Sequence, residues 1–412
     1  MARPKKGVSE KVVTAEEKKE AKKASTPKAS DSLSKKVEKE ASEKAKKDDG
    51  FEILEGIPDS EYFKFEDRSL NSLFAAMFGT PGLTRGKIYE IAGKSDVGKS
   101  ALALRLIGFA QKQGEKGFDI DVEKGLNKEF AKKLGIDASK LMVISPDHGE
   151  GAMKGLRVAI RDKGRSFGVL DSSTACLPEN ETNDAGGGMG AQARMMSSEM
   201  KKVDKIVAKH GAILFVISQV KTKPGVAFGN PEYVSSGGSA VGFHSRVRMV
   251  ISKVEVEKDD KASDAIFQKQ EKSFTMRLVI SKNHTGPKRT VPFDLIVGNP
   301  NMFDIELTKT AVRWAKNFKL VDTSKKSVAG IPFEGRGTEK DLEEVLKGQE
   351  YVVFEAVDAI FKAREDGLDV VAPENAEEGD DMFKGVEIQG DVGSDEFEKV
   401  DLNAVEEDDG EV

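Results

Sequence analysis

One run of eight residues carries the most specific chemistry in this chain. Residues 93–100 read G-x-x-x-x-G-K-S, the spacing of a loop that surrounds the phosphates of nucleoside triphosphates. The two glycines let backbone N–H groups close around phosphate oxygens, and a helix starting after the loop adds its positive N-terminal end. Lys99 would reach the terminal phosphates, and the hydroxyl of Ser100 would bind Mg²⁺. The predicted phosphate site comprises Gly93, Lys94, Ser95, Asp96, Val97, Gly98, Lys99 and Ser100.

Two acidic positions could supply the rest of such a site. Asp171 ends the apolar run 167–170, as expected of a carboxylate on the Mg²⁺ side of the phosphates; alternatively, it caps the next turn. Glu123 ends the alternating run 119–123, where a carboxylate could polarise the attacking water. Spacing alone does not separate Glu123 from Asp121, and we favour Glu123 because it lies at the exit of the predicted strand.

A polar amide and two long loops follow these acids along the chain. Gln219 ends the apolar run 213–218, where it could report the state of the γ-phosphate to the residues after it. Residues 221–239 are rich in Gly, Ser and Pro and carry lysines, and the loop 180–190 contains three consecutive glycines. Loops of this length and composition often carry function. Rich in small residues and poor in aromatic ones, they suit a sugar-phosphate strand better than the edges of bases.

The elements that must position these groups alternate between strand and helix. The predicted strands are 87–92, 117–122, 141–145, 167–170 and 212–218, and the predicted helices are 99–113, 128–134, 149–163 and 192–210. This alternation predicts an α/β fold in which helices cover both faces of a mainly parallel sheet and ligands bind at the carboxyl ends of its strands. We expect antiparallel strands at 246–254, 274–282 and 290–297, and helices at 311–318, 338–346 and 351–363.

Composition divides the 412 residues into four parts. Residues 1–50 are rich in Lys, Glu, Ala and Ser, and residues 374–412 contain 16 acidic residues and two lysines. Neither segment has enough apolar surface to offset the entropy lost on folding. We predict a flexible arm at 1–50, a core at 51–300, a small α-rich or α/β domain at 301–373 and a disordered acidic tail at 374–412.

Charge and cysteine content limit the class of protein. The formal net charge is −6, but it is +8 without the tail. A basic body with an acidic tail suggests a polyanionic partner with which the tail competes, although a merely solubilising tail explains the charge as well. Cys176 is the only cysteine, so no intramolecular disulfide forms. With no signal peptide and no stretch of membrane-spanning length, we predict a cytoplasmic protein without a membrane partner.

Three further runs resemble segments of one family. They are 120–126 (Ile-Asp-Val-Glu-Lys-Gly-Leu), 193–200 (Ala-Arg-Met-Met-Ser-Ser-Glu-Met) and 225–232 (Gly-Val-Ala-Phe-Gly-Asn-Pro-Glu), the last followed by two glycines. With the loop at 93–100, they are similar to the RecA family of homologous-recombination recombinases, bacterial and phage-encoded, over roughly residues 65–300. The resemblance implies a RecA-like P-loop NTPase core that binds ATP, Mg²⁺ and DNA.

The resemblance also implies roles for single residues. Phe130 would stack on adenine, although its alternative role is that of a helix core residue. Phe243 would pack into the next subunit, and Lys282 would reach the ATP of a neighbouring subunit. Two positions depart from the family pattern, because bacterial members usually have lysine at the places of Gly242 and His284. The implied DNA contacts are Gly187, Gly188, Met189, Arg194, Lys221, Lys223, Val226, Phe228, Asn230, Gly237 and Gly238.

We therefore predict a DNA-dependent ATPase that forms a homo-oligomeric helical filament on single-stranded DNA and exchanges strands with a homologous duplex. Single-strand-binding and mediator proteins are expected partners, in a bacterial cytoplasm or that of a phage host. Two alternatives remain: a hexameric replicative helicase, and a DNA-coating scaffold or mediator that uses ATP only for assembly. The runs at 193–200 and 225–232 argue against the helicase, and the placement of Glu123 and Gln219 argues against the scaffold.

Overall fold

A computed structural model describes residues 59–162, 165–182, 190–222, 233–235, 239–258, 271–289, 291–298, 303–371 and 387–390. The described residues from Ser60 onward belong to one compact unit. The predicted arm at 1–50 and all of the predicted tail except 387–390 lie outside the described residues.

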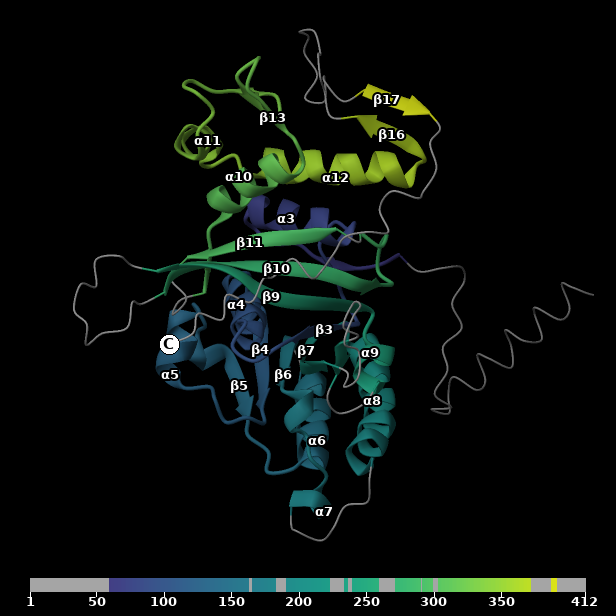
Figure 1. Ribbon diagram of the computed structural model, residues 1–412. Helices are drawn as coiled ribbons and strands as arrows, with labels where there is room; N and C mark the ends of the chain where they lie inside the picture. Colours follow the sequence, from purple (N-terminus) through teal and green to yellow (C-terminus); the bar gives the residue numbers. More distant parts are fainter. Residues whose placement is uncertain are drawn as a thin grey trace, which may run out of the picture. The chain divides into compact units, whose positions relative to one another are not determined.

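A large sheet organises the compact unit, with strand order β12-β11-β10-β9-β3-β7-β6-β4-β5 (Figure 1). Its parallel strands are β3 (Lys87–Gly93), β4 (Lys116–Asp121), β5 (Leu141–Ile144), β6 (Arg165–Asp171), β7 (Ile213–Thr222) and β9 (Val247–Lys258). Its antiparallel side continues through β10 (Glu271–Asn283), β11 (Pro292–Gly298) and β12 (Asp304–Ile305). The short strand β8 (Tyr233–Ser235) pairs with β7. The predicted α/β fold with a mainly parallel sheet is therefore confirmed.

Strand β9 runs in a direction that was not predicted from the sequence. Residues 246–254 were expected to be antiparallel, but β9 lies parallel to β3, with Val247 opposite Tyr89 and Val250 opposite Ala92. That expectation was wrong because the chain crosses over after β7 and returns beside β3 in the same direction. The antiparallel part of the sheet begins only at the pairing of β9 with β10.

Helices cover both faces of the sheet. The helices between residues 99 and 244 are α4 (Lys99–Lys112), α5 (Lys128–Lys133), α6 (Gly149–Arg161), α7 (Glu179–Thr182), α8 (Ala191–His210) and α9 (Ala240–His244), with short 3₁₀ turns at Ala138–Lys140 and Ser173–Ala175. Because side chains alternate along a strand, β6 contributes Phe167 and Val169 to the core under α4, and Leu170 to the core under α6 and α8. Burial on both faces explains why these strands read as nearly continuous apolar runs.

Helix α3 (Arg68–Phe78) was not predicted, although its sequence carries helix signals. Asp67 caps its N-terminus by accepting a hydrogen bond from the Leu70 N–H, and Gly79 ends it in the left-handed conformation with φ 67°. Its apolar face, including Leu70 and Met77, is buried. A two-stranded sheet of β1 (Tyr62–Phe63) and β2 (Leu83–Thr84) flanks the helix in sequence.

The chain after residue 300 packs against the same core. Its elements are α10 (Leu307–Asn317), β13 (Val321–Asp322), β14 (Ser327–Val328), β15 (Ile331–Pro332), α11 (Glu339–Leu346), α12 (Tyr351–Glu365), β16 (Leu368–Val371) and β17 (Glu387–Gly390). Trp314 of α10 is fully buried, and its indole N–H donates to the Asp294 carbonyl of β11 at 2.8 Å. Helix α12 packs on α3. The predicted division at residue 300 therefore stays a prediction, while α10 and α12 share one compact unit with the core.

No helix among the described residues is long and apolar enough to cross a membrane.

Candidate nucleotide-binding site

The predicted phosphate loop lies where strand β3 ends and helix α4 begins. Gly98 immediately precedes α4 and has φ 90°, a left-handed conformation that favours glycine. A Cβ atom at Gly98 would lie 2.7 Å from Cε2 of Phe303, so the ring of Phe303 closes the loop on that side. The loop thus has the strand, turn and helix context that its motif requires.

Lys99 lies buried beneath this loop. Its Nζ donates a hydrogen bond to the carbonyl of Lys94, five residues earlier in the same loop. Burial lowers the pKa of Lys99, and the negative charges of Asp171, Glu123 and Asp96 act in the opposite direction. Lys99 therefore sits among the acidic groups that the sequence analysis placed in one site.

Asp171 ends strand β6 next to the start of α4. Burial raises the pKa of Asp171 to about 6. A hydrogen bond from the Ser100 side chain acts in the opposite direction and lowers this pKa. Its Oδ1 atom is buried and has no hydrogen-bond partner among the described residues. A hard cation such as Mg²⁺ prefers carboxylate and hydroxyl oxygens. Ser100 and Asp171 therefore fit the predicted Mg²⁺ site.

Asp121 and Glu123, between which sequence spacing alone did not decide, have different surroundings in the structure. Asp121 lies directly opposite Asp171 in the pairing of β4 with β6, and its two oxygens accept the N–H groups of Gly125 and Leu126, each at 3.0 Å. Glu123 lies two residues beyond the end of β4, is exposed, and accepts a hydrogen bond from Ser172 Oγ at 2.6 Å. Asp121 thus holds the loop after β4, while Glu123 stays available to the site.

Gln219 lies beside the first glycine of the phosphate loop. It is the Cα partner of Gly93 in the parallel pairing of β7 with β3, and its N–H donates to Thr174 Oγ1 at 3.1 Å. Ser172 and Thr174 were not predicted as site residues; they follow Asp171 and contact Glu123 and Gln219, respectively. Their position directly after Asp171 was a usable signal, but their partners come from distant strands.

Lys282 and Phe243 lie together, away from the phosphate loop of their own chain. Lys282 Nζ donates to the carbonyls of Gly242 at 2.8 Å and of Phe243 at 3.1 Å. The ring of Phe243 is 76% exposed. Across the sheet, Lys282 of β10 is paired with Arg248 of β9, and Arg248 is paired with Glu90 of β3. Glu90 precedes Gly93 by three residues, which is about 10 Å along β3. Burial lowers the pKa of Lys282, and Arg246 contributes in the same direction.

The remaining predicted residues are only partly described. Phe130 is half-buried in α5 and packs against the core, as its alternative role requires. Arg194 is exposed on α8. Lys221 belongs to β7, and only the backbone of this residue is described. The other predicted DNA contacts lie outside the described residues: Gly187, Gly188, Met189, Lys223, Val226, Phe228, Asn230, Gly237 and Gly238.

The two departures from the family pattern lie near Lys282. His284 is exposed, and its backbone N–H donates to the Arg246 carbonyl at 2.8 Å. A Cβ atom at Gly242 would lie 3.4 Å from Glu90 Oε2, an ordinary contact, so space does not require glycine there.

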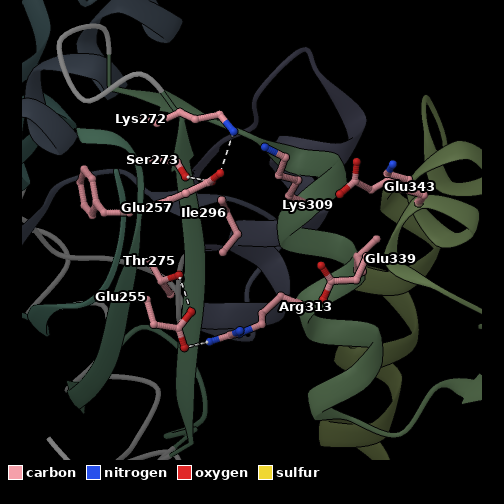
Figure 2. Close-up of a pocket in the computed structure, with 13 residues that line it drawn as sticks. Glu255, Glu257, Lys272, Ser273, Thr275, Ile296, Lys309, Arg313, Glu339 and Glu343 are labelled. Carbon is pink, nitrogen blue, oxygen red and sulfur yellow. Dashed lines mark hydrogen bonds and ion pairs between the residues drawn. The ribbon is translucent and has the colours of Figure 1, made fainter. Parts of the chain in front are cut away.

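A cavity of about 510 Å³ lies away from the phosphate loop. It is lined by the last residues of β9, the first residues of β10, and the helices α10 and α11 (Figure 2). Charged side chains pair in its lining: Arg313 of α10 with Glu255 of β9 at 2.5 Å, and Lys272 of β10 with Glu257 of β9 at 2.6 Å. None of the predicted site residues lines it. The phosphate loop, rather than this cavity, is the candidate site because its residues carry the relevant chemistry.

Comparison with known proteins matches this chain to one family. The model of the RecA N-terminal domain matches residues 40–300. Protein RecA of Anaplasma marginale (strain Florida) is 37% identical over 224 residues, which are 54% of this chain and 60% of that protein. Protein RecA of Bifidobacterium longum (strain NCC 2705) is 32% identical over 309 residues, 73% of each chain. The chain spans about 60% of the length of the first curated relatives that it matches. The match over residues 40–300 and the shared sequence show that the chain belongs to the RecA family.

Proposed function

We propose that this protein is a DNA-dependent ATPase that assembles on single-stranded DNA and catalyses homologous pairing and strand exchange. The observation that carries the proposal is the convergence of four strand ends. The loop after β3, Asp171 at the end of β6, Glu123 after β4 and Gln219 near the end of β7 all lie at the carboxyl edge of the parallel sheet. This edge is where open α/β sheets bind ligands.

Each group has a proposed role that follows from its surroundings. Backbone N–H groups of the phosphate loop and the start of α4 bind the phosphates of ATP. Lys99 moves its ammonium from the Lys94 carbonyl to the terminal phosphates. Ser100 and Asp171 hold Mg²⁺, which supplies positive charge to the phosphate oxygens when bound. Glu123, oriented by the hydroxyl of Ser172, accepts the proton of the attacking water.

Gln219 would transmit the state of the site to DNA. Its backbone is fixed to Thr174, directly after the Mg²⁺ side of the site, and strand β7 continues from it to Thr222. The second predicted DNA loop, residues 220–239, therefore overlaps the end of this strand. We propose that contact of the Gln219 amide with the γ-phosphate orders this loop, so that DNA affinity depends on the bound nucleotide.

The placement of Lys282 and Phe243 supports a site shared between subunits. Both lie away from the phosphate loop of their own chain, and Phe243 exposes a large apolar ring. We propose that Phe243 packs into the next subunit of a helical filament and that Lys282 acts on the ATP held there. Single- and double-stranded DNA, single-strand-binding proteins and mediators in the cytoplasm are the proposed partners.

A strand-exchange assay with the full chain tests this proposal. Circular single-stranded DNA, a homologous linear duplex, ATP and Mg²⁺ should yield joint molecules, and single-stranded DNA should stimulate ATP hydrolysis. Unwinding of a forked duplex by closed rings would instead identify a helicase. Hydrolysis that DNA does not stimulate, without strand exchange, would instead identify a scaffold.

A further inference from the structure

Lys282 lies at the end of strand β10, and the next residue, Asn283, ties this end to helix α3 by hydrogen bonding. We propose that Asn283 is a positioning residue that fixes the direction of the Lys282 side chain and thereby sets the affinity of the assembled site for ATP. This inference rests on the proposed action of Lys282 on a neighbouring subunit's ATP.

A bulge decides which face of the sheet Lys282 takes. Ile280 pairs with Met249 and Lys282 pairs with Arg248, so Ser281 is an extra residue in β10. Without the bulge, Ser281 would be an ordinary strand position and Lys282, two residues after the buried Ile280, would share its face, because side chains alternate along a strand. With it, Lys282 lies on the face of Arg248, whose Nε pairs with the buried Glu90 at 3.2 Å, and reaches α9.

Asn283 holds the strand immediately after this bulge. Its side chain is buried, and its Nδ2 donates to the carbonyl of Phe78, the last residue of α3, at 2.8 Å and to that of Pro287 at 2.9 Å. Its Oδ1 accepts the N–H groups of Thr285 at 3.0 Å and Gly286 at 3.2 Å. One amide therefore closes the turn after β10 and ties it to the C-terminus of α3.

The turn and the helix end touch too closely to slide past each other. A Cβ atom at Gly79 would lie 2.6 Å from Cδ of Pro287, and one at Gly286 would lie 2.5 Å from the Phe78 carbonyl. Such approaches leave no room for a side chain at either glycine. The position of β10 at its bulge is thus fixed by backbone contact as well as by the Asn283 amide.

Arg289 anchors the other end of the same turn. It is 2% exposed, donates to the Ala76 carbonyl of α3, and pairs with Asp358 at 2.8 Å and with Glu365 at 3.1 Å on α12. A cation at a helix C-terminus is favourable because it meets the negative end of the helix dipole. Residues 283–289 are therefore held at both ends, so that loss of Asn283 removes the hydrogen bonds nearest the bulge while Arg289 and the close backbone contacts still retain the turn.

A double-mutant cycle tests the proposal, with Asn283→Ala, Lys282→Ala and the combined variant of the full chain. The measurements are the ATP concentration that half-saturates DNA-stimulated hydrolysis, kcat and the unfolding temperature. Asn283→Ala should raise the half-saturating ATP concentration about tenfold, and should add less than about twofold in the Lys282→Ala background, because contacting residues are not additive.

Asn71→Ala is the matched control. Asn71 also bridges backbone groups, accepting the Phe65 N–H at 3.1 Å and donating to the Pro81 carbonyl at 3.3 Å, but from within α3. It should lower the unfolding temperature without changing the half-saturating ATP concentration. If Asn283→Ala does not fold, Asn283→Ser serves in its place, since its short hydroxyl cannot bridge both carbonyls.

Two outcomes overturn the proposal: an equal effect of Asn283→Ala with and without Lys282, or an equal effect of Asn71→Ala. A different result tests the proposed function itself. If Lys282→Ala alone leaves ATP dependence unchanged, the action of Lys282 on the neighbouring subunit's ATP is wrong, whatever Asn283 does.

Discussion

Gln219 and Gly93 are direct neighbours across the sheet, although 125 positions separate them in the sequence. Gly93 opens the phosphate loop, and Gln219 lies three residues before the end of the strand that leads into the second predicted DNA loop. In a parallel pair such as this, adjacent residues lie about 5 Å apart, so a change at the phosphates can reach β7 without an intermediate element.

This adjacency predicts that Gln219 couples ATP to DNA rather than catalysing hydrolysis. Gln219→Ala removes the amide but keeps the N–H that bonds Thr174. We expect basal hydrolysis to remain within about twofold of the parent, while stimulation by single-stranded DNA falls about tenfold or more, a coupling within the usual range for linked sites. Hydrolysis rates with and without DNA measure this. An equal loss of both rates would make Gln219 part of the hydrolytic site instead.

Lys99→Ala should abolish ATP-dependent strand exchange. Lys99 is the cation buried beneath the phosphate loop, and loss of one such charge-stabilising group typically costs about 10²–10³ in rate. Joint-molecule formation on agarose gels measures the effect. Lys94→Ala is a suitable control because Lys94 offers Lys99 only its backbone carbonyl, which the substitution keeps. Undiminished exchange by Lys99→Ala would contradict the proposed function.

Glu123 and Asp121 should respond differently to loss of charge. Glu123→Gln should fold normally and bind ATP and DNA, but hydrolyse about 10²–10⁴ times more slowly, because general-base catalysis is lost. Its filaments should therefore persist. Asp121→Asn replaces one of two oxygens that accept the N–H groups of Gly125 and Leu126, so it should lower the free energy of unfolding by about 1–3 kcal/mol.

The two variants are compared by steady-state hydrolysis and urea unfolding. Normal turnover by Glu123→Gln would transfer the role of base to another residue. A slow but fully stable Asp121→Asn would point to Asp121 itself.

The parallel part of the sheet could be predicted because local signals agree with it. Apolar runs such as 213–218 are buried on both faces of the sheet. Each is followed by a polar residue, Gln219 after this run and Asp171 after the run 167–170. The direction of β9 could not be predicted because it depends on how the chain returns from a long connection, and local alternation is the same in either direction. Helix α3 shows the reverse case: it was not predicted, although Asp67 and Gly79 are local sequence signals for its two ends.

The residues of the candidate site also fall into those that could be predicted from the sequence and those that could not. Motif residues such as Lys99 and Asp171 are visible in sequence because their chemistry requires fixed spacing. Ser172, Thr174 and Asn283 act through partners on other elements: Glu123, Gln219 and Phe78. Such partners are set by strand order and register, which the sequence of one strand does not contain.

The pKa of Asp171 predicts a stability that depends on pH. Burial raises it to about 6 from 3.8, so the folded protein binds this proton more tightly than the unfolded chain does. Stability without nucleotide and Mg²⁺ should therefore fall as pH rises from about 4 to about 6, and the full penalty, up to about 3 kcal/mol, should persist at higher pH. Asp171→Asn removes the charge and should be more stable than the parent at pH 8, with a smaller difference at pH 5.

Urea unfolding in EDTA at pH 5 and pH 8 measures this difference, and Asp137→Asn is a control of opposite sign. The Asp137 pKa is lowered by a hydrogen bond from the Ser139 side chain, so its ionised form is favoured in the folded state. Its stabilising effect is fully present at both pH values, because both lie above the ordinary pKa of aspartate. Asp137→Asn should therefore destabilise equally at pH 5 and pH 8. An Asp171→Asn variant less stable than the parent at pH 8 would show that Asp171 is stabilised in the folded protein, and that the cation is not needed to offset its burial.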